Sequence, residues 1–246
     1  MDPVDAAEGD LATEATGNRS ATDAPPGADE HLSARWTTRR GREAHRELVV
    51  GGVLLALVAV GGLLFAFRPA HTVIDAWIVG LVGPAHNAGL TGVTSLRYPQ
   101  VILAGSVVVA LVAYPVDRLR SLACLVAPPA ALATCELVVK PLVGRHVGPG
   151  LSYPSGSTVG AAALATAVAL ALPARWRTPA WIVGSAYTLW MSMAVIALQW
   201  HFPTDALAGA AYGAGVVLVV DGVLWALGAG FRGGTTWSRP ATSRGG

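Results

Sequence analysis

Residues 48–67 read LVVGGVLLALVAVGGLLFAF, a run of twenty residues without a charged side chain. The hydrocarbon core of a bilayer needs about 20 such residues in a helix, so this run predicts a membrane span. The rest of the chain agrees, because 53% of its 246 residues are hydrophobic, only 13% are charged, and the mean hydropathy is +0.51. Soluble domains carry about 25% charged residues. We therefore expect an integral membrane protein.

Five more apolar runs extend this pattern along the chain. The stretch 71–93 is weaker than these, since Asp75, His86 and Asn87 interrupt it. We interpret it as interfacial or partly re-entrant, with a seventh span as the alternative. The predicted fold is all-α, a six-helix transmembrane bundle over residues 47–230. The five runs are residues 99–114, 121–139, 155–172, 180–199 and 203–228.

The two ends of the chain differ from this membrane domain. Residues 1–46 are first acidic and then basic, which predicts a disordered acidic N-terminal tail followed by a basic juxtamembrane stretch. Residues 231–246 are rich in Gly, Ser and Arg and are expected to form a flexible tail. No signal peptide is expected, because no short apolar run follows a positively charged start.

Arginine clusters favour one orientation in the cell membrane. Basic residues concentrate in cytoplasmic loops, and with six spans all four clusters fall on one side. Both termini are then cytoplasmic, and residues 68–98, 140–154 and 200–202 face outward. The clustered residues are Arg35, Arg39, Arg40, Arg42, Arg46, Arg118, Arg120, Arg175, Arg177, Arg232, Arg239 and Arg244.

Several other function classes find little support in the sequence. Cys124 and Cys135 are expected to lie roughly 16 Å apart on one helix, too far for a disulfide. No grouping of carboxylates, Cys or His has the spacing of a metal site, so we expect no metal and no cofactor. Membrane orientation explains the basic clusters, so nucleic-acid binding is not expected. The abundance of Ala, Gly, Val and Arg suggests a bacterial source.

The predicted outward-facing loops carry three polar segments. In the first, Lys140 is the only lysine of the chain. Its ammonium group can bind an anion, or it can be a helix-end lysine paired with Glu136 four residues earlier. In the second, the sequence Pro-Ser155-Gly156-Ser157 opens a predicted helix. Free backbone N–H groups there form an anion site, unless the segment is simply a capped helix start.

The third segment reads His201-Phe-Pro-Thr-Asp205. An Asp four residues after a His can contact one imidazole nitrogen, fix the tautomer, and leave the other nitrogen free to attack. The alternative is a purely structural His–Asp pair. Together the three segments predict a pocket that holds an anion beside a histidine, which is the equipment for phosphoryl transfer through a phosphohistidine.

The order of these motifs resembles the type-2 phosphatidic acid phosphatase superfamily, which includes bacterial lipid phosphatases and undecaprenyl pyrophosphate phosphatases. Its members carry Lys-x6-Arg-Pro, then Pro-Ser-Gly-His, then Ser-Arg-x5-His-x3-Asp. The resemblance covers about residues 48–228. It implies that His201 is the nucleophile and Asp205 its orienting partner, with the phosphate held by Lys140, Ser155 and the Gly156 amide.

The chain departs from these motifs at several positions, including that of the histidine that protonates the leaving group. We expect Arg145 and Ser157 to contact the substrate and His146 to serve as a surrogate acid. Loss of a general acid costs about 10²–10⁴-fold, which a diphosphate tolerates better because its leaving group needs less protonation. The replacing residues are Val147, Gly148, Ser157, Ala194 and Val195.

The expected function is that of a membrane lipid phosphatase acting on a polyprenyl diphosphate or another lipid phosphate at the extracytoplasmic face. Two alternatives stay open. One is a catalytically impaired relative that binds or moves a lipid phosphate or serves as a partner subunit, which the replaced motif residues favour. The other is an unrelated transporter or channel. The few intramembrane charges, Glu136, Asp205 and Asp221, argue against it.

Overall fold

The computed structural model describes residues 28–66, 71–85, 88–94 and 97–233. Of the expected tails, residues 1–27 of the N-terminal one (1–46) and residues 234–246 of the C-terminal one (231–246) lie outside this part of the chain. The protein divides into two units, Met1–Arg39 and Arg40–Gly246. All contacts reported below belong to the second unit.

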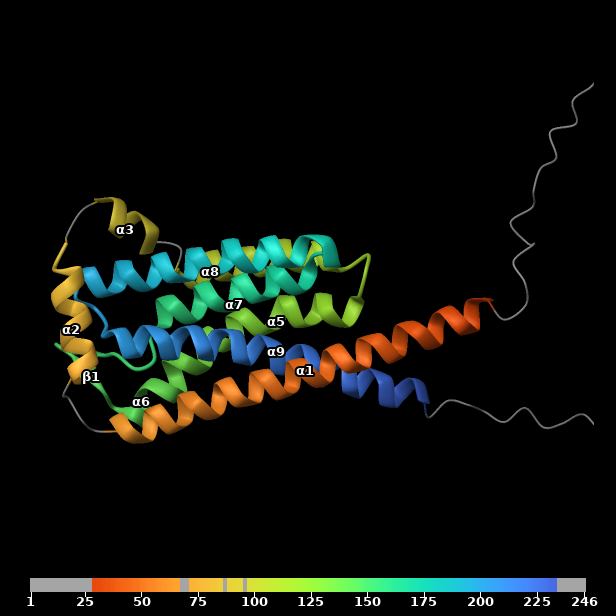
Figure 1. Cartoon of the computed structure of the whole chain (residues 1–246), viewed down its shortest axis with the longest axis horizontal. Coiled ribbons are helices and arrows are strands. Elements are labelled where there is room, and N and C mark those ends of the chain that lie inside the picture. Colours follow the sequence, from red (N-terminus) through yellow and green to blue (C-terminus); the bar gives the residue numbers. More distant parts are fainter. Residues whose placement is uncertain (1–27, 67–70, 86–87, 95–96, 234–246) are drawn as a thin grey trace, which may run out of the picture. The chain divides into compact units, whose positions relative to one another are not determined.

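The described chain is mostly helical (Figure 1). In chain order the elements are α1 (Ala28–Phe65), α2 (Val73–Val82), α3 (Ala88–Thr94), α4 (Pro99–Ala113), α5 (Arg118–Thr134), the π-helical turn η2 (Cys135–Val139), α6 (Lys140–Val143), the strands β1 (His146–Val147) and β2 (Gly150–Leu151), α7 (Gly156–Ala171), α8 (Ala174–Ala197) and α9 (Pro203–Gly233). The strands pair antiparallel, with His146 opposite Leu151.

Within the described part of the chain, four helical segments are long and apolar enough to cross a membrane, which confirms the expected membrane-spanning helical protein. They are Arg39–Phe65, Arg118–Val143, Ala174–Ala197 and Pro203–Gly228. Helices α4 and α7 match two further predicted runs, but they have only 15 and 16 residues. At about 1.5 Å per residue they extend roughly 22–24 Å, short of the ~30 Å hydrocarbon core. Six crossings therefore stay a prediction.

Two segments differ from the helices that the apolar runs predict. Helix α1 begins at Ala28, so the basic stretch expected in the tail continues the first helix. The stretch 71–93 forms α2 and α3, of 10 and 7 residues, each too short for the seventh span considered as an alternative. Helix α2 starts where it does because Thr72 and Asp75 form a reciprocal capping box.

The centre of the bundle is built from small side chains. Ala127 and Ala131 of α5 lie fully buried with Ala163 and Ala167 of α7 in one core cluster, and α9 packs against the same two helices. Small residues let helix backbones approach closely, which is how helices associate in membranes. Large apolar side chains instead point outward, as at Leu111, which is 68% exposed. This distribution suits a surface that contacts lipid.

One end of the bundle holds a network of buried charges, which we call the basal ion network (Arg40, Glu47, Asp117, Arg120, Asp221). The Asp221 carboxylate is fully buried and accepts from Arg40 Nη2 at 2.7 Å and from Arg120 Nη2 at 3.1 Å. Glu47 binds the same two arginines, at 3.0 Å each. These pairs tie α1, α5 and α9 together. Asp221, one of the few intramembrane charges of the sequence, is thus occupied by ion pairs.

Candidate functional site

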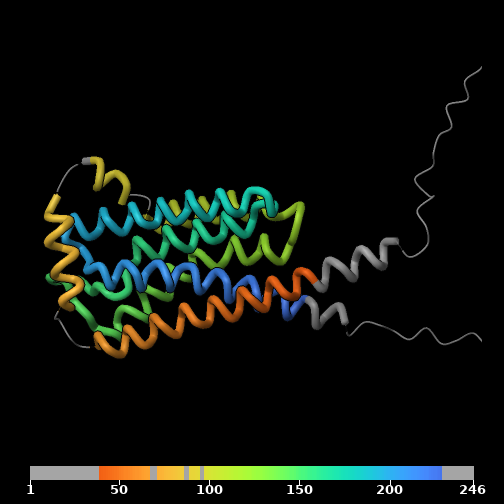
Figure 2. Tube along the Cα trace, in the orientation of Figure 1, coloured from red at the N-terminus to blue at the C-terminus, as the bar shows by residue number. Residues whose placement is uncertain are grey.

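Segments that are distant in the sequence meet at the other end of the bundle. In Figure 2 this end gathers α2, α6, the hairpin and the connection from α8 to α9. Helix α5 arrives through η2, in which the Lys140 N–H bonds to the Cys135 carbonyl five residues back. Such π turns occur often at functional sites. The chain then turns at Gly144, whose φ of 64° suits glycine, and the hairpin leads to α7.

His201 is positioned by the turn that ends α8. Gln199 has a φ of 60°, its amide donates to the Ile196 carbonyl at 2.9 Å, and the Trp200 amide donates to the Val195 carbonyl at 3.0 Å. This is the hydrogen-bond pattern that closes many helices. The His201 amide also donates to the Val195 carbonyl, at 3.3 Å. A further bond, from the Ser155 amide to the Asp205 carbonyl at 2.9 Å, holds the start of α7 against the start of α9. The His201 loop and the α7 N-terminus are therefore fixed to each other.

The imidazole of His201 has one bonded and one unassigned nitrogen. Its Nδ1 lies 2.9 Å from the Ser152 carbonyl, and because a carbonyl only accepts, Nδ1 carries the proton and Nε2 has the lone pair. Burial and the charge of Lys140, with a smaller contribution from Arg97, lower the pKa of His201 to about 3. The side chain is 10% exposed. It is a neutral imidazole with access to the surface.

Asp205 does not make the contact that its spacing predicts. Its Oδ2 lies 3.9 Å from His201 Nδ1, too far for a hydrogen bond, and accepts instead from the Phe202 amide at 2.9 Å. The Ser152 carbonyl fixes the tautomer in its place. The four-residue spacing is right, but the carboxylate turns inward because a buried arginine competes for it.

That arginine is Arg145, expected above to contact the substrate. Arg145 is fully buried, and its Nη1 donates to Asp205 at 2.6 Å while its Nη2 donates to Asp75 at 2.9 Å. Its guanidinium also lies over the Phe65 and Phe202 rings, at 4.1 and 4.8 Å from their centroids. In this structure Arg145 lies beneath the site and joins α2 to α9.

Lys140 lies at the site and is held by a neighbour. Its Nζ bonds to both carboxylate oxygens of Glu136, at 2.7 and 2.9 Å. This is the pairing proposed above as the alternative for Lys140. The same carboxylate lies directly against the Gly156 backbone, where a Cβ would collide with Glu136 Oε1. The Lys140 ammonium and the first residue of α7 thus share one anionic group.

The N-terminus of α7 has no side-chain cap. Ser155 occupies the cap position, but its hydroxyl makes no capping bond and instead accepts from Thr158 Oγ1 at 3.2 Å. Ser155 is fully buried and Ser157 is 5% exposed. The first N–H groups of a helix lack intrahelical acceptors. At α7 the Glu136 carboxylate lies against Gly156, so the start of this helix already has an anion for a neighbour.

His146 lies on the hairpin and is exposed, with its Nδ1 2.9 Å from the Gly144 carbonyl. Among the described residues, no bond joins it to His201 or Lys140. Its role as a surrogate acid stays a prediction.

Sequence reasoning missed Arg97. Its guanidinium lies 4.6 Å from the centroid of the Trp200 ring, next to His201 in the chain, and its charge contributes to the low pKa of His201. Within residues 28–66, 71–85, 88–94 and 97–233, no ion pair to Arg97 is formed. No local pattern could have found it, because Arg97 precedes α4 and belongs to none of the motifs.

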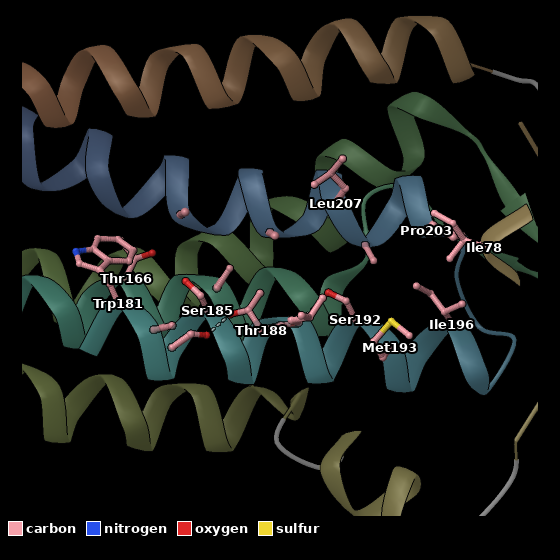
Figure 3. A pocket seen from close by; sticks show the side chains of 17 residues that line it. Ile78, Thr166, Trp181, Ser185, Thr188, Ser192, Met193, Ile196, Pro203 and Leu207 are labelled. Carbon is pink, nitrogen blue, oxygen red and sulfur yellow. Dashed lines mark hydrogen bonds between the residues drawn. The ribbon is translucent and has the colours of Figure 1, made fainter. Parts of the chain in front are cut away.

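An apolar cavity of about 450 Å³ opens near the site between α7, α8 and α9. Figure 3 shows it extending from Ile78 and Pro203 along α8 to Trp181. The hydroxyls of Thr188 and Ser192 in its wall donate to the carbonyls of their own helix, at 2.8 Å each. With these groups already bonded, the cavity presents an apolar surface.

Among the described residues, no group of three or more His, Cys, Asp or Glu side chains could hold a metal ion.

Comparison with known proteins agrees with the motif order. A comparison with curated proteins gives no match. The fold is similar to the crystal structure of a transmembrane PAP2-type phosphatidylglycerolphosphate phosphatase from Bacillus subtilis, with a TM-score of 0.54 and 18% identity over 77% of this chain and 98% of that one. The PAP2 superfamily model matches residues 101–228, just over half of the chain, including every motif residue quoted above. The chain belongs to the PAP2 superfamily, as its motifs predicted.

Proposed function

We propose that this protein hydrolyses a lipid phosphate at the extracytoplasmic surface of the membrane, with His201 as the nucleophile. The observation that carries this proposal is the state of His201. Its Nδ1 is bonded to the Ser152 carbonyl, burial and nearby cations keep the ring neutral, and Lys140 and the α7 N-terminus lie beside it. A neutral imidazole next to an anion-binding group is what attack on phosphorus requires.

The chemistry proceeds in two displacements. His201 Nε2 forms a bond to the terminal phosphorus while the bond from that phosphorus to the leaving oxygen breaks. The leaving group, a lipid phosphate from a diphosphate or a lipid alkoxide from a monoester, departs with the electron pair. Water then attacks the phosphohistidine, releasing phosphate and restoring the imidazole. Charge on the phosphoryl oxygens is stabilised by the Lys140 ammonium and the α7 amides, with Glu136 moving aside. Donors arranged in this way contribute about 10²–10³-fold each.

The leaving group favours a diphosphate substrate. Ser157 stands where the family has its acidic histidine, so protonation of the lipid oxygen is weakened. A phosphate leaving group needs less protonation than an alkoxide. We therefore propose a polyprenyl diphosphate as the preferred substrate, ahead of phosphatidic acid and of phosphatidylglycerolphosphate, the substrate of the solved relative.

The apolar cavity is proposed to hold part of the hydrocarbon tail, because it opens near Pro203, two residues from His201, and lies between membrane helices. Ala210→Leu would fill part of it. For each methylene group displaced, at about 0.8 kcal/mol, KM for a long-chain substrate should rise about fourfold. A water-soluble short-chain substrate should be unaffected, and an equal effect on both substrates would reject this placement of the tail.

The deciding experiment measures phosphate release by detergent-purified protein with chelator present, on undecaprenyl diphosphate, phosphatidic acid and phosphatidylglycerolphosphate. Release that His201→Ala abolishes supports the proposal, and the order of rates tests the leaving-group argument. His146→Ala, compared in the same assay, tests the surrogate acid, which an unchanged rate would exclude. No release from the parent protein on any substrate would reject hydrolysis of these lipids.

A second candidate function has its own motivation in Ser157 and Val195, which replace reactive or charged family residues. The protein would then bind a lipid phosphate without hydrolysing it. Thermal stabilisation by phosphate without turnover, together with turnover gained in Ser157→His, would favour this function over catalysis.

A further inference from the structure

The position of the missing family arginine is now apolar. Val195 is fully buried and packs in one cluster with Val79, Val82, Val93 and Trp200. Yet Val195 lies directly under the site, because its carbonyl accepts the amides of Trp200 and His201. The position that holds an arginine in the family motif is therefore filled by an apolar side chain of the core. Of the cations in the three polar segments, Arg145 has no exposed surface, and Lys140, itself only 8% exposed, is paired with Glu136.

Arg97 brings a guanidinium to the ring of Trp200, next to His201 in the chain, from another segment. It precedes α4, and its guanidinium carbon lies 4.6 Å from the Trp200 ring centroid and 5.8 Å from that of Tyr98. Stacking on an aromatic face retains the full charge of arginine. It also leaves the N–H groups, which lie in the guanidinium plane, free to donate to a second group. Those donors match two oxygens of a phosphate.

The other arginine at this end has no such freedom. Both Nη atoms of Arg145 are bound to carboxylates, and the side chain has no exposed surface. Arg97 is partly exposed, and within the described residues no carboxylate pairs with it. Of the two guanidinium groups here, only that of Arg97 can meet an anion from outside.

We propose that Arg97, supported by the Trp200 ring, binds the phosphate of the substrate beside His201 and replaces the family arginine whose position holds Val195. This inference rests on the proposed function. Arg97 acts as a binding residue, and Trp200 as the residue that positions it.

The test compares Arg97→Ala and Arg97→Lys with Arg118→Ala. Arg118 is the matched control, since its guanidinium lies 5.4 Å from the Tyr114 ring centroid in a comparable stack, between α4 and α5. Binding of inorganic pyrophosphate is measured by calorimetry, and kcat and KM are measured on the best lipid substrate. Arg97→Ala should weaken pyrophosphate binding about tenfold or more, as loss of a charged hydrogen bond does. Arg97→Lys should be intermediate, and Arg118→Ala unchanged.

The outcomes separate this proposal from the proposed function. If the parent protein turns over no lipid, the hydrolase proposal fails, but the pyrophosphate isotherms still decide the role of Arg97. Unchanged binding and unchanged kcat/KM in Arg97→Ala would overturn the inference. An equal loss in Arg118→Ala would also overturn it, since the effect would then come from general surface charge. The thermal midpoint of each variant confirms that it is folded.

Discussion

The two ends of the bundle treat charge in opposite ways. In the basal ion network, two arginines meet three carboxylates, and Asp221 has no exposed surface. At the His201 site, Lys140 pairs with Glu136, whose side chain is 44% exposed, and among the described residues no carboxylate pairs with Arg97. In the basal ion network both arginines are paired with carboxylates of the protein, whereas at the His201 site positive charge is left for an outside partner. The end of the bundle that holds His201 is thus distinguished by cations whose carboxylate partner is exposed or absent among the described residues, rather than by buried charge as such.

The largest effect on stability is expected from disrupting the basal ion network. Asp221→Ala leaves the guanidinium groups of Arg40 and Arg120 short of a buried partner, which should lower the free energy of unfolding by about 3–5 kcal/mol. The measurement is denaturant unfolding in mixed micelles. Asp117→Ala is the control. Asp117 caps α5, because its side chain accepts from the Leu119 and Arg120 amides. This side chain is 28% exposed, so its loss should cost only about 1 kcal/mol. Equal losses of unfolding free energy in the two variants would contradict the expected difference between the buried Asp221 and the partly exposed Asp117.

Lys140→Gln should affect activity rather than stability. The ammonium group is proposed to stabilise charge on the phosphoryl oxygens, so kcat/KM should fall about 10²–10³-fold. The thermal midpoint should change little, since the ion pair that Lys140 makes with the described residues joins it to the half-exposed Glu136. A variant that unfolds while its remaining folded fraction keeps full activity would place Lys140 with the structural charges.

The neutrality of His201 gives a pH dependence with a definite sign. Its pKa falls from 6.5 to about 3 on folding, so the native protein binds fewer protons than the unfolded chain between these values. The stability contributed by this group is complete above about pH 6.5 and is lost as the pH falls toward about 3. His201→Gln should show a weaker decline in the free energy of unfolding over that window. Ring resonances of His201 that titrate near pH 6.5 would contradict the low pKa.

The smallest effect should come from the one anion already at the site. Glu136→Gln keeps the size of the side chain but removes the charge beside Lys140 and Gly156. Pyrophosphate should then bind about two- to fivefold more tightly, the scale of a partly exposed ion pair. Glu136→Asp, which keeps the charge, should bind as the parent does. Weaker binding in Glu136→Gln would show instead that the carboxylate positions Lys140.

Local patterns predicted most of the helices and the motif residues. The runs 99–114 and 155–172 became Pro99–Ala113 and Gly156–Ala171 because apolar length is a local property. The partners of the charged residues were less predictable. Asp205 faces Arg145 rather than His201, and Arg97 lies at Trp200, because these contacts join segments 60 or more residues apart along the chain. Spacing along a helix says which residues can meet, but not which distant charge competes for them.

The direction of the Lys140 side chain is set by the number of residues in the π turn at Cys135–Val139 rather than by which residues they are. A π turn holds one residue more than the α-helical path, and each added residue rotates the remainder of a helix by about 100°. Deleting one residue of this turn would restore a regular α-helix. The Lys140 side chain would then lie on a different face of that helix. In this protein the direction of the Lys140 side chain thus depends on the number of residues in the π turn as well as on the motif residues themselves.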